Sequence, residues 1–429
     1  MSLRCLERIG LCAVVGPGIV TVLVFLLDLL GFHVSRFSVL ISILIAAAAV
    51  WILVRKLPAI VPVREETHKS WGVIAVWLLI WIVLLVVLNA IQNSYWPINT
   101  YDAVSTYDAR AKLIMEQKTV LLKEYQRPLP PNWYYPPFVP LGLAMFYLVG
   151  ISSGKILMTI LYAGLCILVY VNFRRFVPRK NALLFTLLVA SIPYLFSGSL
   201  TATTNFPASV YVTLGAIYLI TWLKTSNSGH AVVSGLLFGL AGWTRTDSVI
   251  FLVAILVGAL LIKPTVWKRL FSLFLVGLPG LVPFVIWYLW LRFSAGYSAN
   301  VPQGSWLPNW AYLAYLMKGM WVMLLTPQKF SVVAPLFLLA TWFSFRTRDV
   351  ENRVVLIGWL FLAGWYACLA ALGPSFDLWK LTVYDSGERL LLSVVPILVF
   401  TTGIQTTIQR WTESVLAKVE SFFKRTRGG

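Results

Sequence analysis

The chain has 429 residues, of which 59% are hydrophobic and only 12% are charged. Its mean hydropathy is +0.81, whereas soluble domains carry about 25% charged residues. These values exclude a soluble globular protein. Long apolar runs recur along the chain, each close to the ~20 residues that a helix needs to cross a bilayer. The sequence therefore predicts an all-α, polytopic membrane protein.

The expected elements are twelve transmembrane helices in a single module over residues 1–429. Residues 1–92 contain the first three spans, and residues 155–407 contain the other nine. The expected spans are residues 9–30, 38–54, 71–92, 155–173, 181–199, 206–223, 229–243, 247–262, 270–292, 330–345, 354–372 and 389–407. Between the two groups, residues 93–154 form a loop with interfacial helices.

The apolar segment from Phe138 to Val149 is too short for a thirteenth span, because about a dozen residues cover only ~18 Å as a helix. Loop charges support this interpretation. With twelve spans and an internal N-terminus, 22 of the 35 Lys and Arg residues lie in cytoplasmic loops and 13 lie outside, as the positive-inside rule requires. An additional span at this position would reverse that ratio.

This topology places both termini in the cytoplasm and two loops, residues 93–154 and 293–329, on the external face of the plasma (inner) membrane. The tail over residues 408–429 has an apolar helical face with Lys and Arg elsewhere, which is typical of an amphipathic helix on an anionic leaflet. The expected site for chemistry is the first external loop.

The net charge is +19, but the charges follow the loops of a membrane protein, so nucleic acid is not an expected partner. The four cysteines form no CxxC motif, and the three histidines are scattered. No metal site is indicated by these patterns, and no cofactor is expected to be required.

The first external loop carries Asp102, Asp108, Arg110 and Lys112 within eleven residues. A helix that begins near Asp102 would have an apolar stripe that lies on the membrane or on other helices. Asp108 and Lys112 are four residues apart and are expected to form a surface ion pair. Asp102 has no such neighbour, and its ordinary role would be a helix N-cap.

Three further motifs follow in the chain. The first is Y-Y-P-P at Tyr134–Pro137, the second is G-L-L-F-G-L-A-G-W-T-R-T-D at 235–247, and the third is S-G-E-R-L-L-L-S-V-V-P at 386–396. Charges at a membrane edge usually form pairs or serve a site. Arg245 therefore either pairs with Asp247 or binds a ligand, and Arg389 either pairs with Glu388, extends toward water or binds a ligand.

The order of these motifs resembles the GT-C superfamily of integral-membrane glycosyltransferases, which use polyprenyl-phosphate-linked sugars as donors. The resemblance extends over about Tyr95 to Pro396. It is carried by Y-D-A-x-x-x-Y-D-x-R-A-K in the first loop, then Y-P-P, G-L-x-x-G-L-A-x-x-T-R and R-L-L-L-x-x-x-P. The chain is similar to small bacterial enzymes related to protein O-mannosyltransferases and to lipid A aminoarabinose transferases.

The resemblance implies an inverting sugar transfer on the external face, from a polyprenyl-phosphate donor in the bilayer to a glycan, lipid or protein acceptor. The first-loop acid that acts as catalytic base falls on Asp102, with Asp108 as the second choice. Asn205 stands where relatives often carry a further acid, which weakens the case for a bound divalent cation. The expected substrate-binding residues are Arg110, Lys112, Tyr134, Tyr135, Arg245, Lys380, Glu388 and Arg389.

Two other classes stay open from the sequence. Twelve spans with both termini inside are common in transporters or flippases, although we find no pair of similar halves such as many transporters have. The other alternative is a membrane scaffold or a polysaccharide polymerase with an unrelated site.

Overall fold

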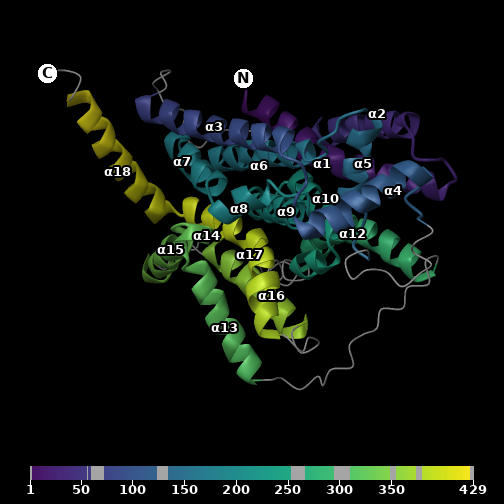
Figure 1. Ribbon diagram of the computed structural model, residues 1–429. Coiled ribbons are helices and arrows are strands. Elements are labelled where there is room, and N and C mark those ends of the chain that lie inside the picture. The colour runs from purple at the N-terminus through teal and green to yellow at the C-terminus, as the bar shows by residue number, and fades with distance from the viewer. Residues whose placement is uncertain are drawn as a thin grey trace.

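The computed structural model describes residues 2–55, 57–58, 72–122, 134–252, 266–293, 310–347, 354–372 and 379–425. Every regular element within these ranges is a helix, which confirms the all-α class (Figure 1). The described long N-terminal helices are α1 (Leu3–Leu29), α2 (Arg36–Arg55), α3 (Val73–Tyr95) and α6 (Ile156–Arg174). They pack side by side, and α1 contacts both α2 and α6.

Helix α9 (Asn205–Thr225) lies at the centre of the bundle and is almost completely buried. It packs against α6, α10 (Ser228–Thr244) and α17 (Trp379–Gly403). Because α9 is apolar on all sides, it needs protein contacts around its whole circumference. Its first residue, Asn205, is thereby held at one end of the bundle, beside residues 100–102 of the loop that follows α3.

Six described helices are long and apolar enough to cross a membrane, and a seventh span results if α17 and α18 (Thr406–Arg425), which meet at 78°, count as one. Shorter apolar helices are also present, among them α5 (Phe138–Leu148), which occupies the segment that we expected to be interfacial. The multi-pass class is confirmed, whereas the count of twelve spans and their orientation stay predictions.

Two segments differ in detail from the sequence-based expectation. The expected span 181–199 is broken into α7 (Arg179–Ala190) and α8 (Pro193–Gly198), because Pro193 has no backbone N–H to continue the helical ladder.

The expected external loop 293–329 contains a helix, α13 (Trp310–Leu324). It packs beside α16 (Val355–Leu372), and the Tyr312 hydroxyl donates to the Leu369 carbonyl at 2.6 Å. Most of the expected span 247–262 lies outside the described residues.

The loop that we expected to be the first external one contains a π-helix, η1 (Ala103–Asp108), which continues into α4 (Ala109–Gln117). Its expected apolar stripe is buried against other helices and does not lie on the membrane surface. The stripe residues Ala103, Tyr107, Ala111 and Ile114 are at most 4% exposed. Since α4 packs on α5, the acidic start of the loop is fixed against the bundle.

Helix α18 has the amphipathic character that the sequence predicted for the tail. Its Trp411, Val415 and Val419 are exposed on one face. Lys180 at the start of α7 holds the helix through an ion pair with Glu420, with 2.6 Å between Nζ and Oε2. Such an exposed apolar face suits a position at a membrane surface.

Candidate functional site

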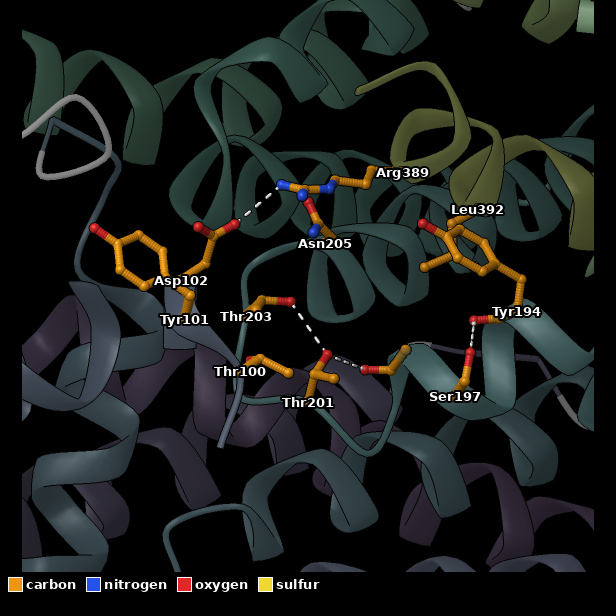
Figure 2. A pocket seen from close by; sticks show the side chains of 11 residues that line it. Thr100, Tyr101, Asp102, Tyr194, Ser197, Thr201, Thr203, Asn205, Arg389 and Leu392 are labelled. Atoms are coloured by element: carbon orange, nitrogen blue, oxygen red, sulfur yellow. Dashed lines mark hydrogen bonds and ion pairs between the residues drawn. The ribbon is translucent and has the colours of Figure 1, made fainter. Parts of the chain in front are cut away.

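A cavity of about 380 Å³ opens where residues 100–102, just before η1, meet α8, α9 and α17. Figure 2 shows its side chains, most of which carry hydroxyls, together with one amide, one acid and one base. We call it the Asp102 cavity. Its lining residues are Thr100, Tyr101, Asp102, Tyr194, Ser197, Gly198, Thr201, Thr203, Asn205, Arg389 and Leu392.

Asp102 and Arg389 form an ion pair across this cavity, with 3.1 Å between Oδ2 and Nη1 (Figure 2). Both side chains are about one-third exposed, at 33% for Asp102 and 34% for Arg389. A partly solvated pair of this kind contributes only about 0.2–1 kcal/mol. A ligand that offers either residue a better partner can therefore replace it.

This pair corrects two sequence-based expectations. Asp102 is not a helix N-cap: its backbone is already helical, and its side chain makes no capping hydrogen bond. Arg389 does not pair with its neighbour Glu388, which instead accepts from Lys329. Adjacent residues on a helix point about 100° apart, so Arg389 faces the cavity while Glu388 faces α14 (Pro327–Phe330).

Asp108, the second candidate base, is engaged away from the cavity. As the spacing predicted, it pairs with Lys112, at 2.7 Å between Oδ2 and Nζ. Its other oxygen accepts from the Tyr147 hydroxyl at 2.7 Å. Burial and the Asp108 carboxylate both raise the pKa of Tyr147, so the phenol keeps the proton that it donates. Asp108 thus has a structural role in joining the first loop to α5.

The Y-Y-P-P motif is held by hydrogen bonds to its backbone. The buried Arg110 donates from Nη1 to the Tyr135 carbonyl at 3.1 Å. The Trp287 indole, on α12 (Val266–Phe293), donates to the Tyr134 carbonyl at 2.9 Å. The two prolines that follow have no backbone N–H groups with which to make hydrogen bonds. The contacts to the two tyrosine carbonyls therefore hold the backbone in place where the chain enters α5. Arg110, which we expected to bind substrate, is therefore completely buried in a contact that holds this motif.

Arg245 is the centre of a second charged cluster. Its Nη2 lies 2.5 Å from Oδ2 of Asp247, as one of the two sequence interpretations predicted. It also donates to Asn205, and its guanidinium lies 5.1 Å from the ring centre of Tyr135. Burial lowers the pKa of Arg245, but Asp247 and Tyr135 outweigh this effect, so the net pKa is raised.

Tyr135 faces this guanidinium. Arg245 lowers the pKa of its phenol, but burial and the Asp247 carboxylate act in the opposite direction and prevail, so the pKa is raised above 10. The phenol consequently stays protonated and can donate to an oxygen of a ligand. Tyr134 lies beside it, with the two ring centres 5.0 Å apart.

Asn205 connects the two clusters, because it lines the Asp102 cavity and accepts from Arg245. A carboxylate at this position would add a second negative charge to the cavity wall, which the amide avoids. Within the described part of the chain, no group of three or more His, Cys, Asp or Glu is placed to hold a metal ion.

The remaining candidates lie elsewhere. Lys112 is on α4 with its side chain 69% exposed, and it is not among the described residues that line the cavity. Lys380 belongs to α17, but its side chain lies outside the described residues. The sequence analysis missed the cavity residues Tyr194, Thr201 and Thr203. The signal for Thr201 and Thr203 was the Ser- and Thr-rich stretch S-G-S-L-T-A-T-T at 197–204, at the end of the expected span 181–199, whereas nothing in the sequence marked Tyr194.

Comparison with known proteins bears on the class. The profile of the dolichyl-phosphate-mannose-protein mannosyltransferase family matches residues 135–290, somewhat more than a third of the chain. Comparisons with curated proteins and with solved structures give no significant match. The family match confirms the resemblance to the GT-C superfamily and, with the apolar helices, indicates a membrane glycosyltransferase. The matched segment, residues 135–290, includes Tyr135 and Arg245, whereas Asp102 and Arg389 lie outside it.

Proposed function

We propose that the protein transfers a sugar from a polyprenyl-phosphate-linked donor to a hydroxyl of an acceptor on the external face of the plasma membrane, with inversion at the anomeric carbon. Asp102 is the general base. The observation that carries this proposal is the Asp102–Arg389 pair in the wall of a polar cavity, since the reaction needs both a carboxylate and a cation there.

At the anomeric carbon, the transfer forms one bond to oxygen and breaks another. The acceptor oxygen attacks the anomeric carbon, while the bond from that carbon to the phosphate oxygen breaks and the phosphate leaves with the electron pair. Asp102 accepts the proton of the acceptor hydroxyl, which typically contributes ~10²–10⁴-fold to the rate. A single displacement of this kind inverts the configuration of the sugar.

Arg389 is the cation best placed to bind the leaving phosphate. Charge-assisted hydrogen bonds to phosphate are about twice as strong as neutral ones, and a partly solvated ion pair is weak. The donor phosphate can therefore replace Asp102 as the partner of Arg389. This exchange releases the carboxylate to act as a base only when the donor is bound.

Arg245 and Tyr135 have a supporting role. Arg245 is already bound by Asp247 and Asn205, so its charge acts on the cavity mainly through the field that it adds near Asn205. Tyr135 remains a protonated donor at the start of α5. Both residues stabilise the wall of the site where negative charge develops on the phosphate.

The decisive experiment compares two carboxylates. We expect Asp102→Asn to lower turnover of a polyprenyl-phosphate sugar by about 10²-fold or more, because the amide preserves the shape of the side chain but cannot accept the proton. Asp108→Asn is the matched control. It alters only the contacts to Lys112 and Tyr147 and should change turnover less than about fivefold.

Both variants are measured as purified full-length protein, at equal concentration and with donor in excess. Asp102→Asn with near-normal turnover would contradict the assignment of the base. A larger loss in Asp108→Asn would show that the wrong carboxylate had been chosen. A wild-type protein that transfers no sugar from any polyprenyl-phosphate donor would refute the proposed function itself.

A further inference from the structure

A second cavity, of about 290 Å³, is lined by residues of α1, α2, α5 and α6. Apolar side chains and glycines make up nearly all of its wall. The Thr21 hydroxyl is its most polar group, but it already donates to the Gly18 carbonyl at 2.8 Å and accepts from the Trp243 indole at 3.0 Å. A cavity with this lining favours hydrocarbon over water.

Two arginines lie at one end of this cavity and face the same aromatic ring. The guanidinium carbons of Arg8 and Arg55 are 5.5 and 4.6 Å from the centre of the Trp51 ring, which is half exposed. Among the described residues, neither arginine forms an ion pair. The acid next to Arg8 in the sequence, Glu7, is instead paired with Arg175 at 2.5 Å. The end of the cavity therefore carries two positive charges without a described counter-ion.

The cations and the cavity share the same faces of the two helices. On α1, Arg8, Cys12 and Gly16 follow at intervals of four residues, and the last two line the cavity. On α2, Ala47, Trp51 and Arg55 follow one another at the same spacing, and Ala47 lines the cavity. Residues four apart lie one above the other on a helix. A molecule in the cavity would therefore extend directly toward the guanidinium groups.

We propose that α1 and α2 bind an anionic phospholipid of the cytoplasmic leaflet. Its phosphate headgroup contacts Arg8 and Arg55 beside Trp51, and part of one acyl chain fills the cavity. The charge distribution of the loops places this end of both helices at the cytoplasmic surface, where basic residues attract anionic lipids and Trp side chains prefer the interface. The two positive charges, which have no acidic partner within the described part of the chain, favour an anionic lipid over a zwitterionic one.

The headgroup is tested by lipid titration of the full-length protein in detergent. Phosphatidylglycerol should bind and raise the unfolding temperature, whereas phosphatidylcholine with the same acyl chains should bind more weakly. The double variant Arg8→Gln/Arg55→Gln should weaken phosphatidylglycerol binding roughly 30-fold, at about fivefold per arginine. Arg346→Gln is the control, because Arg346 is an exposed arginine at the end of α15 (Val333–Thr347), and it should leave binding unchanged.

The acyl chain is tested by filling the cavity. A side chain added at Gly16 meets no atom within 4 Å of its Cβ, so Gly16→Leu should fold normally and weaken phosphatidylglycerol binding at least tenfold. Gly277→Leu, on α12, also meets nothing within 4 Å of its Cβ and should not affect binding. Native mass spectrometry counts the bound lipids in each variant.

Three results would overturn the proposal. The first is equal affinity for phosphatidylglycerol and phosphatidylcholine in the wild type. The second is unchanged phosphatidylglycerol affinity in the double arginine variant. The third is competitive displacement of phosphatidylglycerol by a polyprenyl phosphate, which would assign this cavity to the donor chain. None of these measurements uses sugar transfer, so they stand or fall independently of the proposed activity.

Discussion

The two arginines near the Asp102 cavity form ion pairs that differ in their exposure to solvent. Arg245 is almost enclosed, with its side chain 12% exposed and a bidentate contact to Asp247. Arg389 shares a partly solvated pair with Asp102. Removing one partner of an enclosed pair leaves an uncompensated charge, whereas opening a solvated pair costs little. Loss of Arg245 is therefore expected to cost more stability than loss of Arg389.

This difference gives a prediction for matched variants. Arg389→Gln should weaken donor binding by about 1.5–3 kcal/mol and change the free energy of unfolding by less than about 1 kcal/mol. Arg245→Gln should instead destabilise the protein by about 3 kcal/mol, because Asp247 loses its counter-charge. Donor affinity by titration and thermal unfolding of both purified variants check the prediction. Loss of stability in Arg389→Gln without loss of affinity would mean that the two roles are reversed.

Sequence spacing predicts short-range pairs well and long-range pairs poorly. The Asp108–Lys112 pair follows from an i,i+4 spacing, and Arg245–Asp247 from proximity in the chain. Asp102 and Arg389 are 287 residues apart, so their contact depends on how the first loop packs against the last long helix. No local pattern contains that information, and for this reason Glu388 was the only protein partner that the sequence offered for Arg389, beside water and a ligand.

Helices α10 and α12 pack through direct backbone contact. A Cβ added at Gly235 would clash with the Val276 carbonyl, and one added at Gly239 with the Pro279 carbonyl. Backbone atoms cannot move aside as a flexible side chain can. Such small residues allow close approach of membrane helices, where packing is a main source of stability. The G-L-L-F-G-L-A-G stretch is therefore also a packing motif.

A single added methyl group tests this packing. Gly239→Ala should destabilise the protein by about 1–3 kcal/mol through overpacking. Gly16→Ala, in a helix where the added Cβ meets nothing within 4 Å, should be neutral or stabilise by up to about 1 kcal/mol. Thermal unfolding in the same detergent compares them. An equal effect of both substitutions would show that the contact between α10 and α12 is not tight.

Apolar runs identify most helices but not their interruptions. The spans near α1, α2, α3, α6 and α9 were found within a few residues of their observed ends. The break between α7 and α8 was missed, although Pro193 marks it. Helix α13 was missed because its 15 residues fall short of the ~20 of a full span and include Lys318 and Gly319.

The molecule as a whole carries its charges unevenly, and the topology derived from them remains to be measured. The prediction concerns two exposed serines in a variant without native cysteines. Ser152→Cys, before α6, should react with a membrane-impermeant maleimide added to intact cells, and Ser228→Cys, at the start of α10, should react only after the membrane is opened. The positive-inside distribution is the physical reason. The opposite labelling pattern would invert the model and move the Asp102 cavity to the cytoplasm.

The ion pair between Asp102 and Arg389, whose partners lie two thirds of the chain apart, also determines when the site is complete during biosynthesis. Asp102 leaves the ribosome early, whereas Arg389 is added 287 residues later, in the last long helix before α18. A nascent or truncated chain that lacks α17 has the carboxylate but not the guanidinium. Polypeptides that fail to insert their final helices therefore lack one wall of the cavity, so premature termination yields chains in which Asp102 has lost the guanidinium that faces it.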